Sequence, residues 1–233
     1  MSEPVVVSWS GGKDGCVALH EILESGEYRV ESLLTTVTEG YERVSMHGVR
    51  RGLLEKQAAS LGLPLREVVI PKSASNEIYE ARMGEALSEF RARDVEAVVF
   101  GDLFLEDIRE YRESQLAKAG MRGIFPVWGR DTSAFARDFI GRGFRAVVVC
   151  LDPGKLDETF AGREFDESFL ENLPSDVDPC GENGEFHTFV YEAPIFEKRI
   201  EFDIGETVER DGFVFTDLIP SPGEESRTRS ADS

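Results

Sequence analysis

Basic side chains are scarce in this chain of 233 residues. Only 26 Lys and Arg stand against 45 Asp and Glu, which gives a formal net charge of −19. Affinity for nucleic acid comes largely from Lys and Arg that neutralise phosphates, so this balance argues against a polyanionic partner. A small anion that arrives with a divalent cation is the easier ligand. We therefore do not expect the protein to bind nucleic acid.

Cysteine and long apolar runs are also rare. The three cysteines, Cys16, Cys150 and Cys180, are far apart and form no CxxC pair, so neither a zinc site nor a disulfide framework is indicated. No apolar run approaches the roughly 20 residues that cross a bilayer. The first residues lead directly into a strand-like segment, which argues against a signal peptide. We expect a cytoplasmic protein without membrane contact. The sequence leaves open whether the protein forms a homodimer.

The first 150 residues alternate between apolar strand patterns and helical patterns. The periodicity predicts strands over residues 4–9, 30–37, 65–70, 95–100 and 146–151, and helices over 16–23, 49–61, 76–93, 108–119 and 132–140. Strands that are apolar throughout and alternate with helices indicate a parallel sheet covered on both faces. We therefore predict a doubly wound, Rossmann-like α/β fold, which binds ligands at the carboxyl ends of its strands.

The pattern changes near residue 152. A loop-rich stretch is followed by predicted strands over 186–191 and 195–204, and by a hairpin over 208–218 that turns at Asp211-Gly212. We predict three parts: an ATP-binding α/β domain over 1–151, a smaller α+β domain on the substrate side over 152–220, and a polar, disordered tail over 221–233.

A glycine-rich loop follows the first predicted strand. Six residues form it: Ser10, Gly11, Gly12, Lys13, Asp14 and Gly15. The glycines let backbone N–H groups approach an anion, and the next helix directs its positive N-terminal end to the same place. Ser10 offers a hydroxyl and Lys13 a positive charge. The loop is shorter than GxxxxGK[ST] and differs from GxGxxG, so it predicts a phosphate site of another kind.

This segment resembles the signature of the PP-loop (N-type) ATP pyrophosphatases, usually SGGxDS, which belong to the adenine nucleotide α-hydrolase-like (HUP) folds. The resemblance implies that ATP is cleaved between its α- and β-phosphates and that pyrophosphate leaves. It also implies that adenine lies against the end of the second strand, residues 34–37. Gly15 stands where the signature has serine, so one hydroxyl contact to phosphate is absent.

A second informative stretch covers residues 178–188, Asp-Pro-Cys-Gly-Glu-Asn-Gly-Glu-Phe-His-Thr. Loops of such composition line sites more often than they fill cores, although a tight turn with a solvated face is the alternative. Glu182 and Glu185 can hold Mg²⁺ with phosphates, orient a nucleophile or recognise an amine. His187 can act as an acid or base, or only satisfy a neighbour. Asn183, Gly184 and Thr188 are candidates for substrate binding.

Together with the phosphate loop and Gly101-Asp102, this stretch resembles the diphthine–ammonia ligase family over nearly the whole chain, to about Pro220. That family carries a Gly-Glu-Gly-Gly-Glu-aromatic-Glu-Thr pattern. The resemblance implies amidation of diphthine, a modified histidine on a translation elongation factor, with ammonia displacing AMP. Asn183 and His187 depart from the pattern, and the chain resembles a bacterial side branch of the family.

Other candidates lie at the same predicted sheet edge. Asp102 can bind Mg²⁺ or the acceptor, or only begin a turn. Arg109 and Arg112 lie three residues apart on a helix, so they can clamp an anion or form a solvated face. His47 can cap a helix or face the nucleotide.

We therefore expect an ATP- and Mg²⁺-dependent ligase that adenylates a small or protein-borne carboxylate and transfers it to ammonia or an amine. Lys13, Glu182, Glu185 and His187 are its candidate catalytic residues. A tRNA-modifying enzyme with the same loop is one alternative, which the acidic charge and the unpaired cysteines oppose. A nucleotide sensor without turnover is another alternative. The dense polar stretch at 181–188 opposes it, because a sensor does not need such a stretch.

Overall fold

The computed structural model describes residues 2–40, 43–44 and 47–221. Within these ranges, parallel strands pair in the spatial order β4-β2-β1-β5-β6. Their bounds are β1 Glu3–Ser8, β2 Tyr28–Thr38, β4 Leu65–Ile70, β5 Ala97–Val99 and β6 Arg122–Ile124. A two-residue strand, β3 (Arg43–Val44), pairs antiparallel with the end of β2.

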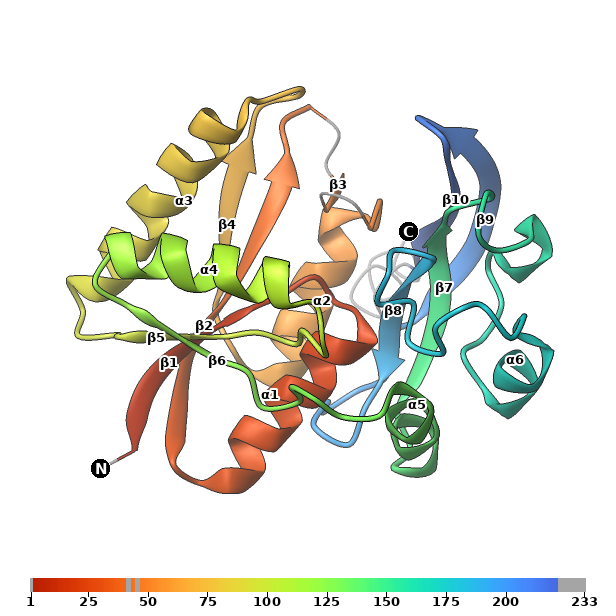
Figure 1. Ribbon diagram of the computed structural model, residues 1–233, viewed down its shortest axis with the longest axis horizontal. Coiled ribbons are helices and arrows are strands. Elements are labelled where there is room, and N and C mark those ends of the chain that lie inside the picture. The colour runs from red at the N-terminus through yellow and green to blue at the C-terminus, as the bar shows by residue number, and fades with distance from the viewer. Residues whose placement is uncertain (1, 41–42, 45–46, 222–233) are drawn as a thin grey trace, which may run out of the picture.

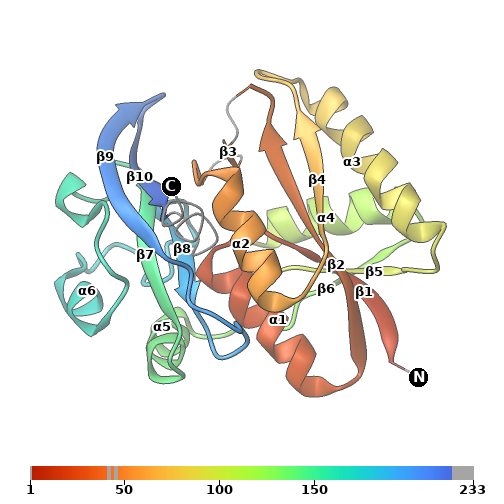
Figure 2. The same ribbon diagram turned by 180° about the vertical axis from the view of Figure 1, so that it is seen from behind.

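Helices cover both faces of this sheet (Figure 1, Figure 2). Helices α1 (Lys13–Ser25) and α2 (Arg51–Leu61) bury side chains in one core, and α3 (Asn76–Arg91) and α4 (Glu106–Lys118) bury theirs in another. The prediction of a doubly wound, Rossmann-like parallel sheet is thereby confirmed. The order of the strands reverses between β1 and β5, so the topological switch point lies between the ends of these two strands.

Strand β1 shows why an apolar run is needed at the centre of such a sheet. Val5 and Val7 belong to the core beneath α1 and α2, whereas Val6 belongs to the core beneath α3 and α4. All three side chains are fully buried. Because alternate residues of a strand point to opposite faces, only a continuous apolar sequence suits a strand covered on both sides.

A second, antiparallel sheet has the order β8-β7-β10-β9. Its strands are β7 Arg145–Leu151, β8 Phe186–Glu192, β9 Phe202–Arg210 and β10 Phe213–Pro220. Helices α5 (Thr132–Gly141) and α6 (Glu167–Asn172) and a 3-10 turn, η1 (Glu158–Phe160), accompany it. Its buried residues join those of α1 and α2 in one core, so these two helices lie between the sheets (Figure 1).

The strand expected over 146–151 does not continue the parallel sheet. It is β7, which pairs antiparallel with β8 and β10. An apolar run shows that both faces of a strand are buried but not which strand lies beside it. The predicted domain limits, 1–151 and 152–220, stay a prediction, and from residue 222 onward the predicted tail lies outside the described residues.

Two further strands differ from the expectation. The run over 195–204 is mostly irregular, and β9 begins only at Phe202. Strand β6 was not predicted, because Arg122-Gly123-Ile124 is a short edge strand that is only partly buried. The hairpin turn at Asp211-Gly212 is confirmed, since both residues have positive φ, 53° and 83°. Across the described ranges, every helix is too short or too polar to cross a membrane.

Candidate functional site

A cavity of about 370 Å³ opens at the switch point, where the loop after β1 meets the loop before β8. Of the residues predicted for the site, nine line it: Ser10, Gly12, Lys13, Asp14, Gly15, Asp102, Glu182, His187 and Thr188. Four other predicted residues are not among the described residues that line the cavity: Gly11, Asn183, Gly184 and Glu185. The two motifs, about 170 residues apart in sequence, therefore face one cavity.

Gly11 holds the phosphate loop in a conformation that requires glycine. Its φ is +81°, and a Cβ there would lie 2.7 Å from Oε1 of Gln57. The fully buried Gln57 accepts a hydrogen bond from Trp9 Nε1 (3.0 Å) and donates to the carbonyls of Gly11 (3.1 Å) and Val190 (2.6 Å). The backbone N–H of Val190 also donates to the Gly11 carbonyl (2.9 Å). Gln57 thus fixes the loop against β8.

The sequence interpretation missed Gln57. Its only signal is a polar side chain in the apolar stripe of α2, next to the buried Ala58 and one turn after Leu53 and Leu54. A buried amide needs hydrogen-bond partners, and here they come from the loop and from β8.

Helix α1 begins at the loop without a side-chain cap. Gly12 is the N-cap, and a Cβ there would lie 3.2 Å from the carbonyl oxygen of Thr188. The N–H of Lys13 donates to Thr188 Oγ1 (3.1 Å), and Ser10 Oγ lies 3.4 Å from the N–H of Gly12. Backbone N–H groups at an uncapped helix start, beside glycine, form a site that suits an anion.

Lys13 lies beneath the loop and not in solvent, with 2% of its side chain exposed. Its ammonium pairs with Asp14 (2.9 Å), donates to the carbonyl of Cys180, and lies over the ring of Phe186. Burial disfavours the charge, but the nearby carboxylates outweigh it, and the pKa of Lys13 is raised above its usual value. A permanent positive charge is thus fixed at the cavity wall.

The carboxyl groups around the cavity have different partners. Asp102 forms an ion pair with Arg112 (2.9 Å), and Glu182 accepts a hydrogen bond from the N–H of Leu103 (2.8 Å). Asp14 has one oxygen bound to Lys13, while its other oxygen is buried and has no hydrogen-bond partner. Burial raises the pKa of Asp14, and it raises that of Glu182 to about 7. Both carboxyl groups are therefore poised to accept a cation or a proton.

No group of three or more His, Cys, Asp or Glu in the described ranges is placed to hold a metal ion. The unpartnered oxygen of Asp14 nevertheless fits a hard cation. Mg²⁺ bound with nucleotide commonly takes one or two carboxylates and fills its other positions with phosphate oxygens and water. The donor set around the cavity is of that kind.

The loop before β8 is held by its own polar groups. Asp178 Oδ1 accepts hydrogen bonds from the N–H groups of Cys180 (2.9 Å) and Glu182 (3.2 Å). Glu185 is buried, and its Oε1 accepts from the N–H of Asp178 and from Asn183 Nδ2, both at 3.1 Å. These contacts close the loop and direct Glu182 to the cavity, with Glu185 turned inward as a brace.

Two imidazoles meet beside the phosphate loop. The ring centroids of His47 and His187 are 4.4 Å apart, with planes tilted by 35°. Burial and the positive charge of Lys13 lower the pKa of His187 to about 4. Burial and the neighbouring His187 hold that of His47 well below its usual value. Both rings are therefore neutral at pH 7, and Nδ1 of His47 is buried without a hydrogen-bond partner.

Gly15, the last residue of the loop, and Gly101, which packs on it, differ in the space around them. A Cβ on Gly101 would lie 2.5 Å from the backbone nitrogen of Gly15, so the end of β5 packs directly on the first turn of α1. A Cβ on Gly15 would lie no closer than 3.8 Å to another atom, the carbonyl oxygen of Ser8. A side chain is thus excluded at Gly101 but fits at Gly15.

The structure gives Arg109 and Arg112 different partners. Arg112 pairs with Asp102 at the cavity, whereas Arg109 pairs with Glu113 (2.9 Å) and lies over the rings of Phe125 and Trp128, 4.7 Å from each. Only Arg112 lines the cavity, and the clamp stays a prediction.

Two family models match the chain. The model of the diphthamide synthase N-terminal domain matches residues 3–123, and that of the diphthamide synthase C-terminal domain matches residues 131–216. The first range contains the parallel sheet with the phosphate loop, and the second contains nearly all of the antiparallel sheet with the loop over 178–188.

Curated relatives show the same similarity at low identity. A diphthine–ammonia ligase of Schizosaccharomyces pombe is 25% identical over 218 residues, which cover 86% of this chain but 36% of that protein. That of Danio rerio is 25% identical over 223 residues, covering 85% of this chain and 86% of the relative. That of Homo sapiens is 23% identical over 225 residues, covering 85% and 82%. The chain thus spans about a third of the yeast protein but most of the vertebrate ones.

Proposed function

Because this chain belongs to the diphthamide synthase family, we propose that it is an ATP-dependent, AMP-forming ligase. It activates a carboxylate as an acyl-adenylate, releases pyrophosphate, and transfers the acyl group to ammonia or an amine. The observation that carries this proposal is that one cavity unites the uncapped start of α1, the buried charge of Lys13 and the polar loop over 178–188.

The phosphate side of the cavity binds the leaving pyrophosphate. Backbone N–H groups of the loop other than those of Gly12 and Lys13, which donate to Ser10 and Thr188, stabilise its negative charge together with the positive end of α1. Lys13 adds a full positive charge, because its raised pKa keeps the side chain protonated. Glycine at residues 11 and 12 lets the loop pack closely, since a Cβ on Gly11 would lie 2.7 Å from Oε1 of Gln57 and one on Gly12 would lie 3.2 Å from the carbonyl oxygen of Thr188.

Asp14 and Asp102 are the residues that would hold Mg²⁺. Asp14 offers a buried oxygen without a hydrogen-bond partner, and Asp102 lines the same cavity. When bound, Mg²⁺ supplies neutralisation of the phosphate charge as ATP is cleaved. These two carboxylates would hold the ion beside the phosphate loop.

The acceptor side of the cavity handles the amine. Glu182, with its pKa raised to about 7, is a suitable group to take the proton of an attacking amine near neutral pH. The neutral ring of His187 offers a lone pair to an N–H of the amine, and Thr188 fixes the start of α1 beside it. Glu185 and Asn183 act by holding the loop in place.

The relatives are named for diphthine and ammonia, so a protein that carries diphthine is the first carboxylate to test. The experiment incubates purified protein with ATP, Mg²⁺, ammonium and that substrate, and resolves the nucleotides. We expect AMP and pyrophosphate that form only with the carboxylate present. A cell extract in place of the defined substrate extends the test to other carboxylates.

The matched variants are Lys13→Met, which removes the buried charge, and Lys198→Met, which removes a charge from an exposed lysine outside the cavity. The first should abolish AMP formation and the second should leave it unchanged. ADP with phosphate, or tight ATP binding without turnover under every condition, would overturn the ligase and favour a nucleotide sensor. AMP that forms only with added RNA would instead indicate a tRNA-modifying enzyme.

A further inference from the structure

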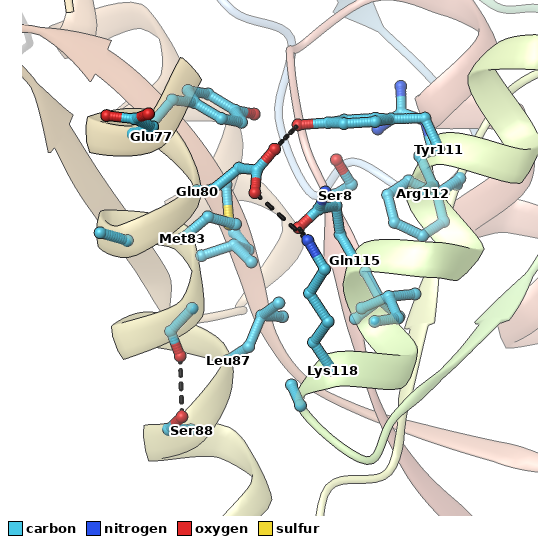
Figure 3. A pocket seen from close by; sticks show the side chains of 18 residues that line it. Ser8, Glu77, Glu80, Met83, Leu87, Ser88, Tyr111, Arg112, Gln115 and Lys118 are labelled. Atoms are coloured by element: carbon cyan, nitrogen blue, oxygen red, sulfur yellow. Dashed lines mark hydrogen bonds and ion pairs between the residues drawn. The ribbon is translucent and has the colours of Figure 1, made fainter. Parts of the chain in front are cut away.

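A second cavity, of about 540 Å³, lies between α3 and α4 above the sheet (Figure 3). Leu34 and Val98 of the sheet form its floor, and Leu87 of α3 and Leu116 of α4 form its walls. Within α4, all of which is described, only Leu116 is buried, so this helix covers the sheet loosely. Of the residues described, those that the proposed function assigns to phosphate, Mg²⁺ and the amine lie outside the lining of this cavity.

This second cavity adjoins the phosphate cavity at the carboxyl ends of β1 and β5. Six residues line both cavities: Ser8, Leu34, Tyr79, Met83, Phe100 and Arg112. A ligand can therefore reach from the phosphate cavity into the space between the two helices. A substrate that reacts at one end and is held along the rest of its length matches this arrangement.

Side-chain contacts span the gap between the two helices (Figure 3). Glu80 of α3 accepts hydrogen bonds from Lys118 (3.3 Å) and from the hydroxyl of Tyr111 (3.4 Å), both of α4. The side chain of Lys118 is 62% exposed, so this link lies at the surface and the aliphatic floor lies beneath it. A ligand that enters from the phosphate cavity passes under the link, which suits a narrow chain and not the surface of a folded protein.

The ionisable groups along the second cavity favour an uncharged ligand chain. Lys118 pairs with Glu80 and donates a second hydrogen bond to Gln115 (3.0 Å). Glu77 is exposed to solvent. Among the described residues of the lining, every cation already has an acidic partner. Methylene groups on the aliphatic floor gain by leaving water, whereas a charge placed there would lose its hydration.

Arg112 lies at the junction of the two cavities with part of its guanidinium free. Its Nε and Nη2 contact the two oxygens of Asp102 (2.9 and 3.1 Å), and the guanidinium lies 4.5 Å from the ring centroid of Phe100. Within the described ranges, Nη1 has no hydrogen-bond or ion-pair partner. Asp102 and Phe100 thus fix the orientation of Arg112, and Nη1 is left to donate to a carboxylate at the junction.

We propose that Arg112 and the cavity between α3 and α4 bind the carboxylate substrate, and that this substrate is a free carboxylic acid with an apolar chain. The proposal rests on the proposed function, in that the ligase needs a carboxylate next to ATP. Nη1 of Arg112 holds the carboxylate at the junction, and the chain lies on Leu34 and Val98. The chain contributes affinity by leaving water, and the guanidinium selects the acid.

Gly84 offers a variant that fills the cavity. It lines the cavity from within α3, and a Cβ there would meet no atom within 4 Å. Gly84→Leu therefore takes up the space without a clash and also favours the helix, because leucine is a far better helix former than glycine. The matched control is Gly52→Leu in α2, where a Cβ also meets no atom within 4 Å and which lines neither of the two cavities.

The first experiment measures binding of octanoate and acetate to the protein without nucleotide by calorimetry, with the melting temperature of each variant. We expect octanoate to bind at least about a hundredfold more tightly than acetate, because its additional methylene groups leave water. Gly84→Leu should weaken octanoate binding by at least about tenfold while its melting temperature rises. Gly52→Leu should bind octanoate as the wild type does.

A second measurement compares octanoate with octanamide, which has the same chain and no charge. The wild type should prefer octanoate by at least about tenfold. Because Arg112→Gln alone would leave Asp102 unpaired, the variants are Asp102→Asn and the double variant Asp102→Asn/Arg112→Gln. The first should keep the preference for octanoate, and the second should lose it.

Octanoate that binds no more tightly than acetate, or equally well to Gly84→Leu and the wild type, would overturn the proposal. An equal loss in Gly52→Leu would also overturn it, as would a double variant that still prefers octanoate. AMP formation with a protein-borne carboxylate at an unchanged rate in Gly84→Leu would reject this site and leave the ligase standing. The expected affinities in a protein that never forms AMP would uphold the site and reject the ligase, so the two proposals fail separately.

Discussion

A methyl group on Gly11 would lie 2.7 Å from Oε1 of Gln57. The same amide group bonds the loop to β8, because it donates to the carbonyls of Gly11 and Val190. The phosphate loop is thus not a free turn. The loop packs against the fully buried side chain of Gln57, which comes from α2 and connects the loop to the second sheet.

We expect Gly11→Ala to destabilise the fold by about 2–4 kcal/mol, because alanine at a φ of +81° is strained and its methyl group overlaps Gln57. Urea denaturation at pH 7 measures this change. The matched control, Gly52→Ala, adds a methyl group in open space on α2 and should stabilise by up to about 1 kcal/mol. A value for Gly11→Ala within about 0.5 kcal/mol of the wild type would contradict this view of the loop.

Much of the parallel sheet and of the cavity lining was predictable from sequence because the signals are local. Glycine after a strand marks the loop, apolar runs mark strands with two buried faces, and the polar stretch over 178–188 marks a second site segment. Nine of the predicted site residues do line one cavity. The roles given to them stay predictions.

What the sequence did not reveal depends on distant partners. Gln57 is one polar residue in an apolar stripe, and its importance appears only when its bonds to Gly11 and Val190 are seen. Glu185 has the same local signal as Glu182, yet one turns inward and the other faces the cavity. The apolar sequence over residues 146–151 is typical of a buried strand in either sheet, and pairing with β8 decides between them.

Gly15→Ser should be tolerated and should favour nucleotide binding. The space at this position is open, with 3.8 Å to the nearest atom, and serine is a better helix former than glycine by about 0.5 kcal/mol. A hydroxyl in the first turn of α1 also adds a donor near the phosphates, for a gain of a few-fold in ATP affinity at most. Thermal melting and calorimetry with ATP measure both effects.

The adjacent Gly101→Ser is the contrasting variant. Its side chain would collide with the backbone of Asp14 and Gly15, so it should weaken both stability and ATP binding. A loss of ATP affinity in Gly15→Ser as large as the loss expected for Gly101→Ser would contradict this prediction. It would show that the loop has no room for the hydroxyl that the PP-loop signature carries at this position.

The carboxyl of Glu182 should make the fold less stable as pH rises from about 4.5 to about 7. Its pKa is raised from 4.5 to about 7 by burial, so over this range the folded state keeps a proton that the unfolded state has lost. The stability that the protonated Glu182 contributes is fully present below pH 4.5. It amounts to about 2 kcal/mol of unfolding free energy, after allowance for the partial exposure of the side chain. Glu182→Gln, which imitates the protonated form, should remove this loss.

Kinetics give a separate readout for Glu182. If this group takes the proton of the amine, the rate of amide formation, divided by the concentration of unprotonated amine at each pH, should rise with pH through about 7 and become flat and low in Glu182→Gln. Wild-type pH dependence in the variant would show that another group carries the proton, even if the stability result holds.

His187 should act on stability in the opposite direction. Burial lowers its pKa to about 4, so as pH falls below about 6.5 the unfolded chain takes up a proton that the folded protein refuses, and stability is lost until about pH 4. As pH falls over this range, Glu182 adds stability, whereas His187 and the similarly buried His47 remove it. Relative to the wild type, His187→Gln should therefore shift the slope of stability against pH in the negative direction, and Glu182→Gln should shift it in the positive direction. Urea denaturation between pH 4.5 and 6.5 measures both slopes, and shifts of equal sign in the two variants would show that burial does not act on these groups as the structure implies.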